Sequence, residues 1–323
     1  GIYPITFSLL ADYFHEEHRA TASAWVGVAW VIGQMAGQSI AGFVTPSFGW
    51  RLTFILVAIP NFLLVLIFAL YAREPERGRT EKALESLIQK GLAYKQKITL
   101  SDFKIIFANK TNLWTFLQGL PGTVPWGILG FFMIDFLELK RHFKKEEATL
   151  IFMLIGAGLL IGSVLFANIA ERLYKKNPKS MPFLCGIGIL AGVIPAYILF
   201  NIPIETKPLF NDFLIFSIIA FVAGFLVSVP FANVKAILMN VNRPEHRGSV
   251  FAVFNITDNI GQGFGPAIGG LLLVFGYQFV MNFSIFWWIP AGILFLVMIT
   301  SITKDRNNLQ ELMQNRAKEM SKD

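Results

Sequence analysis

The chain has 323 residues, of which 54% are hydrophobic and only 15% are charged, and its formal net charge is +7. This composition excludes an ordinary soluble globular protein, because a soluble core of this size could not bury so much apolar side chain, and it indicates an all-α polytopic membrane protein. The single cysteine, Cys185, excludes a disulfide within the sequence and a cysteine-based metal cluster.

Apolar stretches follow one another along the chain, and most approach the roughly 20 residues that a helix needs to cross a bilayer. We predict spanning helices at residues 1–14, 20–44, 51–71, 112–136, 148–170, 181–200, 212–238, 249–274 and 278–301. The sequence starts with Gly1 and has no charged segment before the first apolar stretch, so its start resembles neither a native N-terminus nor a signal peptide.

An internal repeat relates two of these helices. The run Glu17-His18-Arg19 and the later Ile32-Gly33-Gln34 recur as Glu245-His246-Arg247 and Ile260-Gly261-Gln262, each displaced by 228 positions. Two related membrane halves are typical of secondary transporters, whose halves rock about a site between them. If each copy lies at the next-to-last helix of a six-helix half, the opening helix is the fourth, and we expect three helices to precede the given sequence.

These features divide the chain into four predicted parts. They are the remainder of an N-terminal bundle (1–71, helices 4–6), a central loop (72–111), a six-helix C-terminal bundle (112–303, helices 7–12) and a tail (304–323). Most of the 28 Lys and Arg residues lie on the side of the central loop and the tail, which places both in the cytoplasm. Helical spacing predicts two amphipathic helices in the central loop, carried by Leu84, Leu87, Ile88 and Leu92 and by Leu100, Phe103, Ile106 and Phe107.

Ionisable groups at membrane depth are candidates for function because they are costly there. Asp258 lies about eleven residues into its predicted helix, on a polar stripe with Asn255, Asn259 and Gln262. It is either a protonatable or cation-binding carboxylate or one satisfied by the neighbouring Asn side chains. Lys235, in the preceding helix, either snorkels to water or reaches toward Asp258.

Two glycine- and proline-rich stretches stand out within spans. In residues 119–127 we predict unwound backbone and a cavity lined by Trp114, Gln118, Thr123 and Trp126, because interrupted spans often mark transport sites. In residues 261–270, small residues at four-residue spacing favour either close helix packing or a moving hinge. The candidate packing or hinge residues are Gly33, Gly37, Gly261, Gly265, Pro266, Gly269, Gly270, Pro121 and Pro125.

Arg19 and Arg247 lie at predicted helix N-termini, where the helix dipole disfavours a cation. Both therefore need carboxylate partners, and the candidates are Asp12, Glu16, Glu17 and Glu245. A charge latch between the halves, with candidates Asp12, Arg19, Glu171, Arg172 and Arg247, would close one gate and break in the other state; charge that only sets topology is the alternative. All four histidines lie in predicted loops, so no metal site is predicted.

Several motifs together resemble the major facilitator superfamily (MFS) along the whole chain. They are Glu245-His246-Arg247-Gly248, Gly261 to Gly270, Gly49-Trp50-Arg51, Arg73-Glu74-Pro75, and Glu171-Arg172-x2-Lys175-Lys176 with Ala167 where glycine is usual. The resemblance implies the MFS fold of two pseudo-symmetric six-helix bundles, with about nine of twelve transmembrane helices present. It also implies a central cavity, with candidate lining residues Gln118, Trp126, Asn233, Lys235, Asn255, Asp258, Trp30 and Gln34. Residues 123–127 and the Asp258 helix are more loosely similar to spinster-like carriers.

The sequence thus predicts a secondary active transporter that moves a small organic or amphipathic solute by alternating access of a rocker-switch type, with H+ or another ion as candidate coupling partner at Asp258. The alternatives are a transporter-like membrane sensor or scaffold and a lipid-acting membrane protein without ion coupling. We predict no enzyme activity and no cofactor, because no His, Ser or carboxylate cluster is visible at an interface. We predict no nucleic-acid partner, because the basic charge fits the topology and the attraction of anionic lipids. We expect a monomer, in contact with membrane lipids, in the plasma or cell membrane.

Overall fold

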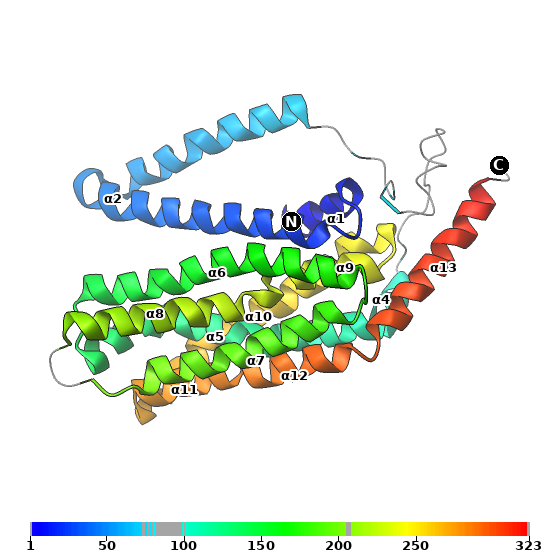
Figure 1. The fold of residues 1–323 in the computed structure, drawn as a ribbon. Coiled ribbons are helices and arrows are strands. Elements are labelled where there is room, and N and C mark those ends of the chain that lie inside the picture. The colour runs from blue at the N-terminus through cyan, green and yellow to red at the C-terminus, as the bar shows by residue number, and fades with distance from the viewer. Residues whose placement is uncertain are drawn as a thin grey trace.

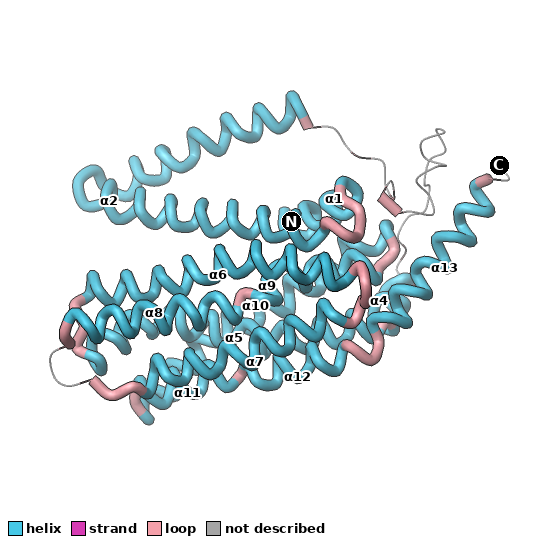
Figure 2. Tube along the Cα trace, viewed as in Figure 1, coloured by secondary structure: helices cyan, strands magenta, loops and turns pink. Residues whose placement is uncertain are grey.

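The computed structural model describes residues 2–72, 75, 78, 80, 81, 99, 101–204 and 208–321, which are helical apart from turns and short connections (Figure 1, Figure 2). The elements are α1 (Ile2–Tyr13), α2 (Arg19–Tyr71), α4 (Asp102–Ala108), α5 (Lys110–Arg141), α6 (Lys145–Tyr174), α7 (Ser180–Asn201), α8 (Phe210–Val227), α9 (Val229–Val241), η1 (Pro244–His246), α10 (Arg247–Leu272), η2 (Leu273–Phe275), α11 (Tyr277–Phe286), α12 (Trp288–Met298) and α13 (Ile302–Met320). The predicted all-α class is confirmed.

A sharp turn at Gly49 divides α2 into two arms that run in opposite directions and diverge from the turn (Figure 1). Gly49 has φ +77° and ψ +164°, a conformation that glycine adopts without a Cβ clash. Directly after the turn, the Arg51 guanidinium lies 4.6 Å from the Trp50 ring centroid, within cation–π distance. The turn separates the two spans that the sequence predicts before and after it.

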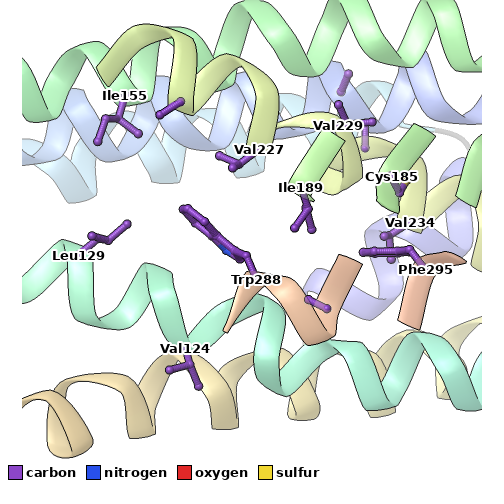
Figure 3. Packing of buried hydrophobic residues seen from close by; sticks show 14 of the residues in the cluster. Val124, Leu129, Ile155, Cys185, Ile189, Val227, Val229, Val234, Trp288 and Phe295 are labelled. Carbon is purple, nitrogen blue, oxygen red and sulfur yellow. The ribbon is translucent and has the colours of Figure 1, made fainter. Parts of the chain in front are cut away.

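Helices α5 to α12 pack into one bundle, with α5 against α10 and α12, α6 against α8, and α7 against α8 and α12. Buried apolar side chains from α5, α6, α7, α8, α9 and α12 meet in its interior (Figure 3). Helix α1 packs on α10, and the first arm of α2 packs on α6 and α9, so both lie along one side of the bundle (Figure 1). The main contacts between the two predicted halves among the described residues are therefore α1 with α10 and α2 with α6 and α9, and α1 also touches α9.

Glycines bring α5 and α10 close together. A Cβ on Gly127 would clash with the Gln262 carbonyl oxygen, and a Cβ on Gly265 would lie 2.7 Å from the Val124 carbonyl oxygen. Gly261 and Gly269 face α5 in the same way. The close approach expected at Gly33, Gly37 and Gly270 is not observed, because a Cβ there would meet no atom within 4 Å.

The interruption predicted in residues 119–127 is wrong. Helix α5 continues through Pro121 and Pro125 from Lys110 to Arg141. Side chains bond carbonyl groups around the prolines: Thr123 Oγ1 donates to Gly119 O at 2.7 Å, and Trp288 Nε1 donates to Gly122 O at 3.3 Å. Pro121 and Pro125 remove the N–H donors to the Leu117 and Pro121 carbonyls, yet α5 stays helical, with α10 packed closely against it.

Six helical segments among the described residues are long and apolar enough to cross a membrane: Phe48–Tyr71, Lys110–Arg141, Lys145–Tyr174, Ser180–Asn201, Phe210–Val241 and Tyr277–Met298. The spans predicted at 1–14, 20–44 and 249–274 are helical but are not among these six. Helix α1 has only 12 residues, the first arm of α2 is rich in small residues, and α10 carries the polar stripe around Asp258.

The second predicted amphipathic helix of the central loop is present as α4, whose Ile106 is buried. The first, with Leu84, Leu87, Ile88 and Leu92, and also Leu100, lie outside the described residues. In the tail, α13 buries Leu309 and Met313 in a small cluster of its own.

Candidate functional site

Two fully buried arginines begin corresponding helices of the two halves. Arg19 begins α2 and is 1% exposed, and Arg247 begins α10 and is 0% exposed. Arg19 Nη2 donates to Ala11 O at 3.1 Å, and Arg247 Nε donates to Met239 O at 3.2 Å. Each arginine thus bonds the carbonyl oxygen of the residue eight positions before it, and the repeat seen in the sequence is also a repeat of local hydrogen bonding.

The same two arginines reach across to the other half. Arg19 Nη1 donates to Asn240 Oδ1 at 2.9 Å, and Arg247 Nη1 lies 3.6 Å from Asp12 Oδ1. Asp12 and Asn240 are themselves displaced by 228 positions, so the crossing is reciprocal. We call Arg19, Arg247, Asp12, Asn240 and Glu81 the arginine cluster.

Glu81 lies between the two guanidinium groups. Its Oε1 accepts from Arg19 Nη2 at 3.0 Å and also from Arg247 Nη2. Burial alone would raise the pKa of the Glu81 carboxyl, but Arg247 and Arg19 outweigh it and lower that pKa to about 2. The backbone just before Glu81 also bonds Asp12, because the Gly78 backbone N–H donates to Asp12 Oδ1 at 3.0 Å. The sequence reasoning missed Glu81, which lies in a polar stretch without helical periodicity.

Further contacts join the halves beside the arginine cluster. The backbone N–H and the hydroxyl of Thr21 donate to the two carboxylate oxygens of Glu171, each at 2.7 Å. Of the candidate carboxylates, Asp12 partners Arg247, whereas the other three pair elsewhere: Glu16 with Arg306, Glu17 with Lys175 and Glu245 with Arg316. Arg172 is exposed and has no ion pair or hydrogen bond among the described residues.

A second polar group lies deeper, where α1, α9 and α10 meet. Asp258 of α10 is close enough to Lys235 of α9 and to Tyr3 of α1 for its charge to act on both side chains. Helix α5 closes the other side: a Cβ on Gly119 would lie 2.9 Å from Asp258 Oδ1, and Thr123 Oγ1 donates to Asp258 O at 2.7 Å. The structure therefore brings Asp258 and Lys235 of the predicted site into one neighbourhood.

The remaining candidates divide into three groups. Asn255 and Asn259 bond each other along α10, with Nδ2 of Asn259 3.0 Å from Oδ1 of Asn255, and Gln262 continues this stripe as an exposed residue. Two candidates are buried, Gln118 and Asn233. Trp126 is partly buried and contacts Trp288, with ring centroids 5.3 Å apart. Trp30 is 60% exposed and makes no aromatic or cation–π contact with the described residues, and the side chain of Gln34 lies outside what the structure describes. Among the described residues, no group of three His, Cys, Asp or Glu could hold a metal ion.

Comparisons with known proteins identify the family of the chain. A family model described as Major Facilitator Superfamily matches residues 1–210 and 200–312. The chain is 24% identical over 280 residues to the cis,cis-muconate transport protein of Acinetobacter baylyi, covering 84% of this chain and 62% of that protein. It is 23% identical over 318 residues to Multidrug resistance protein 3 of Bacillus subtilis (85% and 58%) and 21% identical over 200 residues to the niacin transporter NiaP of A. baylyi (54% and 44%). The chain thus spans less than two thirds of the length of these relatives.

Proposed function

Because the chain belongs to the Major Facilitator Superfamily, we propose that it moves a small organic or amphipathic solute across a membrane by alternating access. It is an integral multi-pass membrane protein, and the family indicates a transporter and not an enzyme. Relatives named for the transport of cis,cis-muconate and of niacin support a small organic solute. The similarity to spinster-like carriers stays a prediction.

The observation that carries this proposal is the arginine cluster. Its contacts within each half, from Arg19 to Ala11 and from Arg247 to Met239, persist if the halves separate. Its crossed contacts, from Arg19 to Asn240 and from Arg247 to Asp12, need the halves together. Alternating access requires such a set of bonds, made in one state and broken in the other. We therefore propose that the cluster is a latch that holds one gate closed.

We place the latch on the cytoplasmic side, with the central loop and the tail, because most Lys and Arg residues lie in the loops of that side. With this topology we propose the division of the chain into residues 1–71, 72–111, 112–303 and 304–323. Asp258 and Lys235 lie deeper in the contact between the halves, and we propose that the solute and a coupling proton bind there. We expect a monomer, since each chain holds its own crossed contacts.

The test is solute flux. The chain is reconstituted in liposomes with an internal pH dye, and pools of organic anions, cations, sugars and lysolipids are added. We expect one pool to give flux, and Arg247→Ala to change its rate several-fold, whereas Arg172→Ala, which removes an exposed arginine without a described partner, leaves it unchanged. Silence of the pH dye with every pool would rule out proton coupling, and absence of solute uptake as well would overturn the proposal and favour a membrane sensor or scaffold.

A further inference from the structure

Lys235 is a cation at membrane depth without a salt bridge. Its Nζ donates to Phe231 O, one turn earlier in α9, and lies 4.4 Å from the Phe231 ring centroid and 5.9 Å from that of Phe7. No carboxylate of the described residues lies within the 4.0 Å salt-bridge distance of this ammonium group. A lysine ammonium has three N–H donors, so at least one is left for a ligand.

Asp258 is the matching anion, but it lies at another depth. Lys235 is six residues from the end of α9, and Asp258 is eleven residues into α10, so a rise of about 1.5 Å per residue separates the two by about 8 Å along the bundle. The Asp258 carboxylate accepts no hydrogen bond from any described residue. Both side chains are partly exposed. Two incompletely bonded charges of opposite sign, separated by the length of a small molecule, form a site for a ligand and not a finished ion pair.

We propose that Lys235 binds the carboxylate of a small organic acid, and that Asp258 takes up a proton from solution when this carboxylate binds. This inference rests on the proposed transport function and names the solute class. The ammonium attracts an anion, and the Phe7 and Phe231 rings beside it offer apolar contact to the body of the ligand.

The proton follows from charge balance. Without ligand, the ammonium of Lys235 and the carboxylate of Asp258 balance each other; a second carboxylate would leave one uncompensated negative charge in a low-dielectric site. A proton bound to an Asp258 oxygen removes this charge, and no other bond changes. Among the described residues, the titratable groups that face the site are Tyr3 of α1, Lys235 of α9 and Asp258 of α10, whereas α5 contributes Gly119 and Thr123, which do not titrate.

The experiment is calorimetric titration of the purified chain with benzoate, its neutral analogue benzamide and its cationic analogue benzylamine. We expect benzoate to bind best. Lys235→Met should lower the affinity for benzoate by at least about tenfold and leave the affinity for benzamide unchanged, whereas Lys235→Arg should still bind benzoate. Titrations in buffers of different ionisation enthalpy count protons, and we expect uptake of about one proton per benzoate, which Asp258→Asn abolishes while benzoate still binds.

Each outcome either supports or overturns the inference about Lys235 and Asp258. Benzoate binding that is absent in the unaltered chain, or equal in Lys235→Met, would overturn the inference, and so would binding without proton uptake. Should Lys235→Met fail to fold, the proton count of the unaltered chain against Asp258→Asn still tests it. Flux of some solute in liposomes, with no carboxylate site at Lys235, would leave the transport function standing while this inference fails.

Discussion

Arg19 and Arg247, which are 228 positions apart, donate to one carbonyl oxygen, that of Met239, and to one carboxylate, that of Glu81. Two buried guanidinium groups that contact the same carboxylate oxygen repel each other, so the arrangement depends on the anions between them. Asp12 and Glu81 supply two negative charges against two positive ones. The contact between the halves is therefore electrostatically balanced only while both carboxylates are in place.

Glu81→Gln should open this contact. Glutamine has a similar shape but no charge, and removing one member of a buried ion pair typically costs about 3 to 5 kcal/mol. Separating the halves relieves the cost, so we expect faster amide hydrogen exchange in the segments around Arg19 and Arg247. Mass spectrometry of deuterated peptides measures this directly.

Glu17→Gln is the matched control for that experiment. Glu17 pairs with Lys175 at 2.8 Å, but the two side chains are 30% and 49% exposed, so this ion pair should contribute less than about 1 kcal/mol. Equal exchange in the two variants would refute the idea that Glu81 holds the arginine cluster together.

The pKa of Glu81 predicts an acid-sensitive contact. This pKa is lowered from 4.5 to about 2 in the folded protein, so its stabilisation is complete above about pH 4.5 and is lost as the pH falls toward 2. At 1.36 kcal/mol per unit the shift corresponds to about 3 kcal/mol. The groups facing Glu81 are Arg19 and Arg247, with Asp12 next to them.

The measurement compares the melting temperatures of the unaltered chain and Glu81→Gln between pH 6 and pH 2. We expect the difference between them to be largest near pH 6 and to shrink below about pH 4.5. A difference that stays constant to pH 2 would show that the charge of Glu81 contributes nothing.

The helices and the repeat could be predicted from the sequence, because long apolar stretches and a motif displaced by 228 positions are local patterns. Arg19 and Arg247 were identifiable for the same reason: each is a cation at a helix N-terminus that needs an anion. The reciprocal partner of Arg247, Asp12, was among the candidates.

Glu81 could not be predicted, because its partners lie 62 and 166 positions away and its own segment shows no periodicity. The continuity of α5 was missed for a similar reason. Prolines within a span suggest a break, but α5 packs closely against α10, where Gly127 meets the Gln262 backbone far along the chain. Pairing at such distances depends on how helices meet, which local patterns do not encode.

The close packing of α5 against α10 predicts that adding one methyl group lowers the stability at some positions and not at others. Gly265→Ala would place a Cβ 2.7 Å from the Val124 carbonyl oxygen, which belongs to rigid helical backbone. We expect a loss of about 1 to 3 kcal/mol from overpacking, seen as a lower melting temperature. Gly263→Ala, on the same helix with nothing within 4 Å, should instead be neutral or stabilising by up to about 1 kcal/mol. Equal effects of the two substitutions would refute the close packing of α5 against α10 at Gly265.

Thr21→Val tests whether the Thr21–Glu171 contact also holds the halves together. Valine keeps the branched shape and the backbone N–H but removes the hydroxyl, so one Glu171 oxygen loses its 2.7 Å donor. The loss should be about 1 to 3 kcal/mol, and hydrogen exchange near residue 21 should rise.

Two further variants separate this contact from the general effect of losing a threonine hydroxyl. Thr21→Ser keeps the hydroxyl and should restore the original exchange. Thr149→Val removes a hydroxyl that bonds only the Lys145 carbonyl of its own helix, and we expect little change. If Thr21→Val and Thr149→Val behave alike, the hydroxyl of Thr21 does not join the halves, and the crossed contacts of Arg19 and Arg247 must hold them together without it.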